Sequence, residues 1–442
     1  MFKQVLPLSF IISLRFFGLF IVLPVISLYT LSFPGATPQI VGIVVGGYAI
    51  TQMIFQVPFG AMSDVFGRKG TIITGLLLFA IGSLLCAIAT DLLTLLLGRF
   101  LQGAGAIGAV ITAMISDLVK EEQRPKAMAI MGGMIGISFA LAMGVGPVIA
   151  GFAGVQTLFW ITAILPLISI YIIIKMVPDA PQVTHTYHNH SKWKFLLKNE
   201  IVMMNITNFL QKGFMTFAFM IIPIVLVKTF GWELTDLWKV YVPALIAGVL
   251  SMGPSAMLAE KKGKYKEVLI LGILLFGVSF YLIGNSTTEL SFLVGVIVFF
   301  IGFNMHEPIM QSLTVKYAKV HEKGKVLGVF NTFGYGGTFL GGLIGGLYLV
   351  EVDGNFFQSL YDISMTIVLV CAVWFLLISR LPNPAKTSNA YIGIENMNEQ
   401  KYTPLDTLAG VEEWYINNTE KVLIVKYNNT LLDEETIKNS IQ

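Results

Sequence analysis

Charged residues are scarce in this chain of 442 residues: Asp, Glu, Lys and Arg together make up 12%, whereas hydrophobic residues make up 55%. An ordinary soluble domain is about a quarter charged, so this shortage excludes a typical soluble protein and indicates a membrane protein. The formal net charge is only +3. Because the basic residues form no groove with interleaved aromatic side chains, we expect no nucleic-acid partner.

Cysteine and histidine are also rare, with two and five copies. Cys86 and Cys371 lie in separate apolar runs, so they imply neither a disulfide nor a metal pair. His185, His188 and His190 share a polar segment, where histidines are usually solvated, so we expect no metal and no cofactor. Neither a GxxxxGK[ST] phosphate loop nor a nucleophile with a nearby base is present, so we expect no ATP-driven action and no enzyme.

Long apolar runs fill the first 380 residues. A helix needs about 20 residues to cross a hydrocarbon core of about 30 Å, and lipid offers open strands no partners. We therefore predict an all-α membrane fold. Its twelve transmembrane helices are expected near residues 5–30, 40–60, 70–89, 92–118, 125–152, 157–176, 201–228, 236–258, 267–285, 289–317, 325–350 and 359–380. The first run follows Lys3 like a secretion signal, but Arg15 interrupts it and no cleavage site follows, so we expect it to remain.

Basic residues gather in alternate connections between these runs, for example at Arg68 and Lys69 and at 261–266. The other connections carry mostly acidic residues. Since Lys and Arg accumulate on the cytoplasmic side, we expect a multi-pass protein of the inner (plasma) membrane with both chain ends in the cytoplasm.

The chain divides into two similar halves and a tail. A polar loop at 177–200 separates six runs in 1–176 from six in 201–380, and residues 60–68 are echoed at 256–264. Such a pseudo-symmetric duplication is typical of transporters that rock two halves around a central site.

The tail has a different composition from the two halves. After a linker at 381–390, residues 391–442 are polar and predict a small cytoplasmic α+β domain of ferredoxin-like type. Its elements are expected as strands at 391–395, 411–416 and 422–427 and helices at 399–408 and 432–440.

Three motifs carry a family resemblance. "GAMSDVFGRKG" (60–70) resembles the signature of the major facilitator superfamily, and "LLLGRFLQGAGAIG" (95–108) resembles the motif of its fourth helix. The run at 125–152 resembles the antiporter motif of the fifth helix through Gly133, Gly146, Pro147 and Gly151, although Ala142 and Ala150 replace usual glycines. Together with "LRFFGLFIVLPV" (14–25), "FNMHEP" (303–308) and the tail, they are similar to the YajR type of proton-coupled drug antiporter.

The resemblance implies a conformational latch at the membrane edge. It assigns the latch to Gly60, Asp64, Gly67, Arg68 and Asp117, whose charges would hold the outward-facing state. Gly60 is expected to permit close helix packing. Val65 stands where the family usually has a further basic residue. The alternative is a plain basic loop of the positive-inside kind.

Ionisable groups far from helix ends are costly in lipid and are therefore functional candidates. Glu307 and His306 form such a pair, and burial favours their uncharged forms, so Glu307 is a candidate proton carrier. The resemblance implies a role in proton coupling and transport for Asn304 and Glu307, whereas His306 departs from the pattern. The alternative is that Glu307 and His306 bond to each other or to Asn304 and only fix helix packing.

Three cations also lie within the apolar runs. Arg99 matches an arginine that the family associates with proton coupling, with carbonyl contacts as the alternative. Arg15 is counted with the candidate residues for proton coupling and transport, and the alternative is that it snorkels towards the membrane surface. Lys212 belongs to no recognised motif and is the weakest functional candidate of the three cations.

We thus predict a monomeric secondary transporter that exports small lipophilic or drug-like molecules in exchange for protons, with a small-molecule substrate, protons and membrane lipid as its partners. Two alternatives remain, namely an exporter of a sugar or other metabolite and a membrane sensor with a transporter-like fold. No residue pattern distinguishes the substrate.

Overall fold

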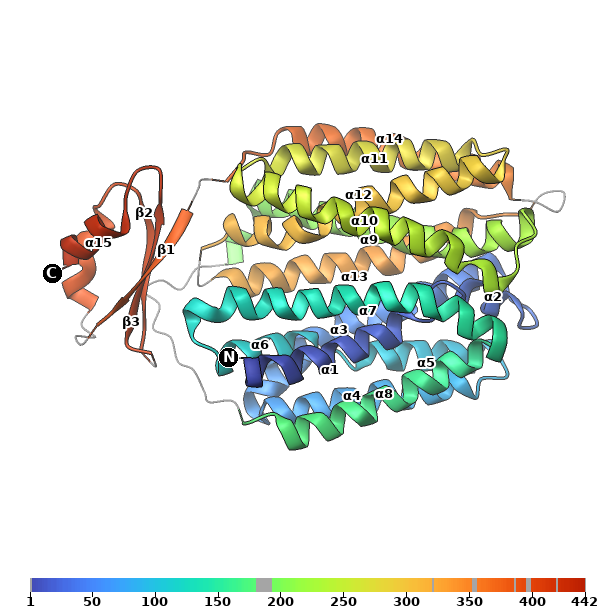
Figure 1. The fold of residues 1–442 in the computed structure, drawn as a ribbon, viewed down its shortest axis with the longest axis horizontal. Coiled ribbons are helices and arrows are strands. Elements are labelled where there is room, and N and C mark those ends of the chain that lie inside the picture. The colour runs from blue at the N-terminus through green and yellow to red at the C-terminus, as the bar shows by residue number, and fades with distance from the viewer. Residues whose placement is uncertain are drawn as a thin grey trace.

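The computed structural model describes residues 2–179, 193–319, 322–351, 356–384, 387–394, 399–418 and 420–441. His185, His188 and His190 lie outside these residues. Within them, no group of three or more His, Cys, Asp or Glu side chains is placed to hold a metal ion. Two groups of helices lie side by side, and a small domain lies at one end of them (Figure 1).

The first group contains helices from the first half of the chain. They are α1 (Phe2–Phe20), α2 (Ile26–Leu31), α3 (Pro38–Val65), α4 (Arg68–Ala87), α5 (Leu92–Ala104), α6 (Gly108–Leu118), η1 (Glu121–Gln123), α7 (Arg124–Ala153) and α8 (Val155–Met176). Two predicted continuous helices are each broken in two. Pro24 lacks the N–H that a helix interior needs and lies in the break between α1 and α2. Gly105 lies in the break between α5 and α6, where a Cβ would meet the carbonyl oxygen of Gly75 at 2.3 Å.

The second group follows from residue 193 onwards. Its elements are η2 (Trp193–Leu197), α9 (Asn199–Ile224), the π-helical turn η3 (Val225–Thr229), η4 (Leu234–Asp236), α10 (Trp238–Ala256), the π-helical turn η5 (Met257–Lys261), α11 (Tyr265–Gly284), α12 (Glu289–Lys316), α13 (Lys323–Tyr348) and α14 (Phe357–Ser379). The duplicated stretch has the same backbone feature in both halves. Gly67 and Gly263 both have a positive φ, of 87° and 72°, which favours glycine just before α4 and α11.

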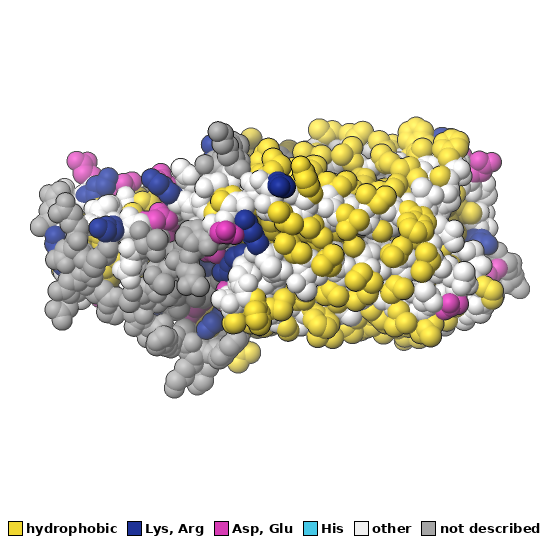
Figure 2. All heavy atoms as spheres, turned by 90° about the horizontal axis from the view of Figure 1, so that it is seen from below, with side chains coloured by type: hydrophobic (Ala, Val, Ile, Leu, Met, Phe, Trp, Pro, Cys, Tyr) yellow, Lys and Arg dark blue, Asp and Glu magenta, His cyan; other side chains and the backbone are white. Residues whose placement is uncertain are grey.

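Ten of the helical spans in the described residues are long and apolar enough to cross a membrane, rather than all twelve that we predicted. The shorter apolar stretch Gln4–Phe20 and the glycine-rich α13 are not among the ten. Hydrophobic side chains cover the middle of the bundle, and charged side chains lie mainly towards its ends (Figure 2). This surface is that of a multi-pass membrane protein, because a belt of apolar side chains matches the hydrocarbon core.

The two halves are packed unevenly along their length. We call the end where α3 meets α4 and α10 meets α11 the basic end, after Arg68 and the lysines at 261–266, and the opposite end the far end. Towards the far end, a Cβ at Gly42 would lie 2.0 Å from the Gly342 carbonyl oxygen. At Gly346 it would lie 2.3 Å from that of Pro38. Backbones therefore touch across the halves at this end.

At the basic end, glycines on helices that face each other across the halves have open space beside them. A Cβ at Gly60, Gly132, Gly253 or Gly328 would meet nothing within 4 Å. Our expectation that Gly60 permits close helix packing is therefore wrong for this arrangement. The bundle is closed at the far end and separated at the basic end.

The small domain is a three-stranded antiparallel sheet with helices on it. Its elements are β1 (Thr387–Gly393), the 3₁₀ helix η7 (Glu399–Asp406), β2 (Val411–Asn417), β3 (Val422–Asn428) and α15 (Glu434–Ile441), with strand order β1-β3-β2. Tyr402, Leu405, Trp414 and Ile437 are among its buried core. The arrangement fits a ferredoxin-like domain, but β1 begins at Thr387, inside the predicted linker, and η7 is a 3₁₀ rather than an α-helix.

This domain contacts the first half through Glu121, on the η1 turn that precedes α7. The side chain of Glu121 accepts hydrogen bonds from the Tyr415 hydroxyl and, at 2.7 Å, from the Asn417 amide. The backbone N–H of Glu121 donates to the Glu420 carboxylate at 3.0 Å. The turn between β2 and β3 thus rests on the basic end of the bundle.

Candidate functional site

Glu307 lies on α12 and is bound by two side chains of α9. Its Oε1 accepts from Lys212 Nζ at 2.5 Å and from Gln211 Nε2 at 3.0 Å. Nine residues separate Glu307 from the end of α12 at Lys316, a distance of about 14 Å along a helix. The Lys212 and Glu307 side chains are 25% and 33% exposed, so water and protons can reach this ion pair inside the bundle.

His306 and Asn304 point to other neighbours. Successive helix residues are rotated by about 100°, so three nearby positions on α12 face three different helices. His306 is fully buried, and its Nε2 donates to the Leu269 carbonyl of α11 at 2.9 Å. Its ring fills the space that Gly272 leaves open, because a Cβ there would lie 2.2 Å from Nε2.

Asn304 donates to the Phe300 carbonyl of its own helix and lies against Gly248 of α10. The structure therefore brings together neither His306 nor Asn304 with Glu307. Among the described residues, the bonds that the packing alternative proposed between His306, Glu307 and Asn304 are absent, because His306 bonds to α11 and Asn304 to its own helix. Lys212, which the sequence ranked last, is the partner of Glu307.

Arg99 is fully buried and well bonded within the first half. Its Nε and Nη2 donate to the Val44 and Val45 carbonyls of α3, at 3.1 and 3.3 Å, and its Nη1 donates to Gln102 at 2.8 Å. Its guanidinium lies over the Tyr48 ring, with Cζ 4.9 Å from the ring centroid. The carbonyl-contact alternative describes this geometry.

Arg15 does not snorkel, because its side chain is only 1% exposed. One bond is present, from Nη2 to Gln52 Oε1 at 3.3 Å, while Nε and Nη1 have no hydrogen-bond partner. Gln52 in turn donates to the Tyr335 hydroxyl of α13 at 2.7 Å. A polar chain therefore runs from α1 through α3 into the second half.

The predicted charge cluster at the basic end is formed. Arg68 donates to Asp64 at 2.6 Å, to Asp117 at 3.0 Å and to the Ser63 hydroxyl at 2.6 Å. All four residues belong to the first half, and Gly60 and the first turns of α13 around Gly328 have no packing contact across the halves. The cluster therefore exists while the basic end is separated, so its presence alone does not define the outward-facing state that we expected it to hold.

The second half has a related cluster that we did not predict. Glu260, the counterpart of Asp64, binds Lys316 at the end of α12 at 3.2 Å. It also accepts bonds from Ser312 and Tyr265, each at 2.5 Å. Here the helix end supplies the cation, whereas in the first half it supplies the acid Asp117. The echo of Asp64 at Glu260 was visible in the sequence, but its partner was not.

The antiporter-like residues of α7 divide into two groups. Near the far end, a Cβ at Gly146 would lie 2.3 Å from the Ile21 carbonyl oxygen, and one at Gly151 would lie 2.1 Å from Thr235 Cγ2. Gly133, nearer the basic end, would meet nothing within 4 Å. α7 continues through Pro147 to Ala153. Gly151 thus packs closely against the second half at the far end, whereas Gly146 packs against Ile21 of the first half.

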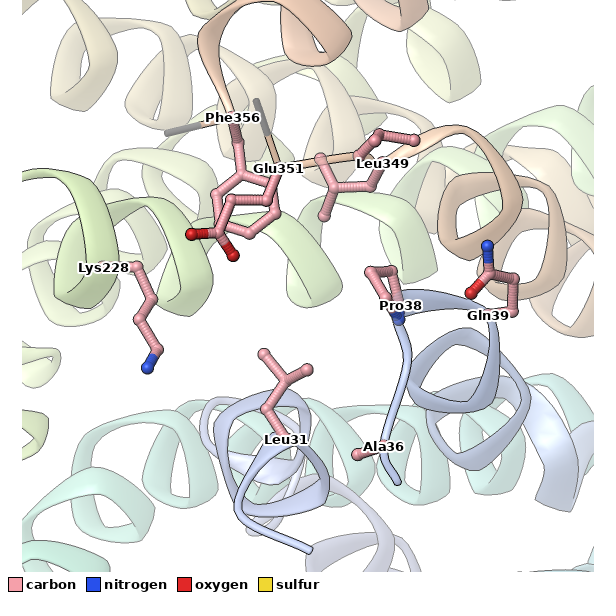
Figure 3. Close-up of a pocket in the computed structure, with 9 residues that line it drawn as sticks. Leu31, Ala36, Pro38, Gln39, Lys228, Leu349, Glu351 and Phe356 are labelled. Atoms are coloured by element: carbon pink, nitrogen blue, oxygen red, sulfur yellow. The ribbon is translucent and has the colours of Figure 1, made fainter. Parts of the chain in front are cut away.

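A cavity of about 360 Å³ lies at the far end between the halves. Leu31, Ala36 and Pro38 line it from the first half, and Lys228, Glu351 and Phe356 from the second (Figure 3). Gly346 packs against the backbone of Pro38, one of the lining residues. The cavity is therefore an outer recess above the tight contact of the halves.

The two helical groups face each other, and they are closed at one end and separated at the other. The Lys212 and Glu307 pair lies inside the bundle and is reachable by water. These features define a membrane transport protein rather than an enzyme. The chain belongs to the Major Facilitator Superfamily, whose profile matches residues 8–342 and 245–405. It is 33% identical over 455 residues to the inner membrane transport protein YajR of Escherichia coli (strain K12), covering 98% of this chain and 96% of that one.

Two further similarities extend over most of the chain. The quinolone resistance protein NorA of Staphylococcus aureus is 26% identical over 400 residues, which cover 84% of this chain and 96% of NorA. A bacterial homolog of the human lysosomal transporter Spinster, in an inward-facing and occupied conformation, has the same fold with a TM-score of 0.68. It is 14% identical and covers 86% of this chain and 96% of that one.

Proposed function

We propose that this protein exports small lipophilic or drug-like molecules across the inner membrane in exchange for protons, by alternating access of its two halves and with the proton gradient as its energy source. The observation that carries the proposal is the Glu307 and Lys212 pair. A carboxylate that is paired with a cation deep in the bundle and reachable by water can be protonated and released from its partner.

Coupling follows from the two states of this pair. When Glu307 is ionised, it holds Lys212 and Gln211, which joins α12 to α9. Protonation removes the charge attraction and leaves Lys212 without its counter-ion. Because an unpaired charge is costly in the bundle, the protonation step changes the relative stability of the conformations.

The sidedness of the proposal rests on the basic residues. Arg68 and the lysines at 261–266 lie at the basic end, so this end and both chain ends are assigned to the cytoplasm. The structure then corresponds to an inward-facing state, open to substrate from the cytoplasm. We count twelve spans by adding α1 and α13 to the ten apolar ones, since both helices lie within the bundle. We assign the whole cycle to a monomer.

The similarity to NorA, which is named as a quinolone resistance protein, and the antiporter-type motif of α7 favour drug-like substrates over a sugar or other metabolite. The test uses the full-length protein in proteoliposomes with a pH gradient and two lipophilic dyes, the cation ethidium and the anion 8-anilinonaphthalene-1-sulfonate, each assayed separately. Wild-type protein should move dye and protons in opposite directions. Dye movement that is independent of the pH gradient, or proton movement that is independent of added dye, would contradict exchange and favour a sensor or a uniporter.

A further inference from the structure

The buried guanidinium of Arg15 lacks the partners that a buried charge requires. Two of its three nitrogens, Nε and Nη1, have no hydrogen-bond partner, and the third makes one bond of 3.3 Å. No carboxylate of the described residues forms an ion pair with it. A buried charge without compensation opposes folding, so an Arg kept in this condition is expected to serve a purpose other than packing.

Arg99 shows how the same fold satisfies an arginine that is structural. It is equally buried and in the same half, yet all three of its nitrogens donate to oxygen atoms of α3 and α5. The fold therefore can supply acceptors to a buried guanidinium. Around Arg15 it supplies aromatic rings instead, with Phe16 and Phe79 centroids 5.7 and 5.6 Å from Cζ.

These rings belong to a small aromatic cluster between the halves. Its buried members are Leu19, Tyr48, Ala49 and Phe79, and the partly exposed rings of Phe16, Phe20, Tyr335 and Phe339 pack against it. Tyr335 and Phe339 come from α13 in the second half. Arg15 lies thirteen residues after Phe2, the first residue of α1, and therefore about 20 Å along that helix.

The rocking of the two halves that the proposed function requires would uncover Arg15. The bond from Gln52 to the Tyr335 hydroxyl joins α3 to α13, so it breaks when these two helices separate. The guanidinium is then exposed to whatever lies between the halves. A ligand there would contact groups from both halves, which is how binding is coupled to rocking.

We infer that Arg15, Gln52 and Tyr335 form a recognition site for the anionic group of an amphiphilic organic anion, whose apolar body lies against the surrounding aromatic rings. The inference rests on the proposed function and specifies a substrate class for it. A carboxylate would supply the missing acceptors for Arg15 Nε and Nη1. The rings would accept an aromatic or aliphatic body, because they present apolar surface next to the charge.

The test uses the purified full-length protein in detergent and three probes of one shape: 2-naphthoate, the neutral 2-naphthalenemethanol and the cationic 2-naphthylmethylammonium. Ligand binding is measured as the rise in the midpoint of thermal unfolding with probe concentration. We expect 2-naphthoate to raise the midpoint of the wild type more than the other two probes. Inorganic phosphate is a further arm, and an equal effect of phosphate would overturn the organic part of the assignment.

The variants Arg15→Gln and Arg99→Gln make the same substitution at an arginine with few partners and at a fully bonded one. Without ligand, Arg15→Gln should unfold at a higher temperature than the wild type, since an unpaired charge is removed, whereas Arg99→Gln should unfold at a lower one. Arg15→Gln should also lose the preference for 2-naphthoate, and Arg15→Lys should retain part of it. A lower midpoint for Arg15→Gln, or wild-type protein without preference for the anion, would overturn the inference.

These measurements need neither a proton gradient nor transport. Failure of both the anionic and the cationic dye to exchange with protons in proteoliposomes would therefore count against the proposed function, while selective binding of 2-naphthoate would still identify the site. The opposite result, exchange without anion preference, would remove the site and leave the function intact.

Discussion

The ammonium of Lys212 lies 2.5 Å from the carboxylate of Glu307 and joins α9 to α12 inside the second half. The two side chains are 25% and 33% exposed, so the pair is screened less than a surface pair and is still reachable by protons. Gln211 bonds to the same carboxylate oxygen. The carboxylate therefore has a neutral and a charged neighbour, and its protonation removes the charge attraction to Lys212.

Replacing Glu307 with Gln should remove the pH dependence of transport, because the amide cannot take up a proton. Transport of the dye that the wild type exchanges for protons would be measured in proteoliposomes across a series of pH values, for wild type and variant. A pH profile of Glu307→Gln with the wild-type shape would exclude Glu307 as the proton carrier.

Replacing Lys212 with Met should lower the free energy of unfolding by about 1–3 kcal/mol, because Glu307 would keep only Gln211 as a partner. Adding Glu307→Gln to this variant should restore most of the loss, since no unpaired charge remains. Thermal or denaturant unfolding of the two single variants and the double variant gives the coupling between the positions. Strictly additive losses would show that the pair contributes nothing.

Gly42→Leu and Gly60→Leu should shift the two conformations in opposite directions. A side chain at Gly42 collides with the Gly342 backbone, so it should open the far end, whereas one at Gly60 meets nothing here and should oppose closure of the basic end. Spin labels at Ser32 and Lys228 would report the far-end distance by pulsed electron resonance. The distance should increase for Gly42→Leu and stay at its short value for Gly60→Leu. The same distance distribution in both variants would contradict the assignment of a closed far end and a separated basic end.

Much of this architecture could be predicted from the sequence because lipid imposes strict rules on length and apolarity. The runs from 40–60 to 359–380 correspond to helices, and the family resemblance named the acids Asp64 and Asp117, both of which contact Arg68. Local effects were harder to foresee. Pro24 and Gly105 break helices that apolarity alone would continue, and β1 begins at Thr387 because its pairing with Asn428 of β3 decides its start.

The partners of buried polar groups could not be predicted, since they depend on which face of a helix meets which neighbour. Glu307 and His306 are adjacent in sequence but point in directions about 100° apart, so one meets Lys212 and the other Leu269. Lys212 itself is part of no motif. Gln52 and Tyr335 are 283 residues apart in the chain, and nothing in the sequence indicates that they are hydrogen-bonded.

Asp64→Asn and Asp117→Asn should separate transport from stability at the basic end. Asp64 is 66% exposed, so its pair with Arg68 should contribute within about 0.5 kcal/mol to stability. Asp117 is 17% exposed, and its loss should cost about 1–2 kcal/mol. We expect Asp64→Asn to insert and unfold like the wild type but to reduce transport sharply. Wild-type flux in vesicles would refute a role for Asp64 in the conformational cycle.

Glu121→Ala should release the small domain from the bundle without unfolding either part. The carboxylate of Glu121 is the acceptor for both Tyr415 and Asn417, so its removal leaves the turn between β2 and β3 without these bonds. Hydrogen exchange should become faster in peptides that cover 119–124 and 411–418, while exchange in α12 stays unchanged. Glu122→Ala is the matched control, since Glu122 is exposed on the same turn. If both variants exchange alike, the contact through Glu121 does not hold the domain. If transport by Glu121→Ala equals that of the wild type although the domain is released, the docked position of the domain is not required for the basal cycle.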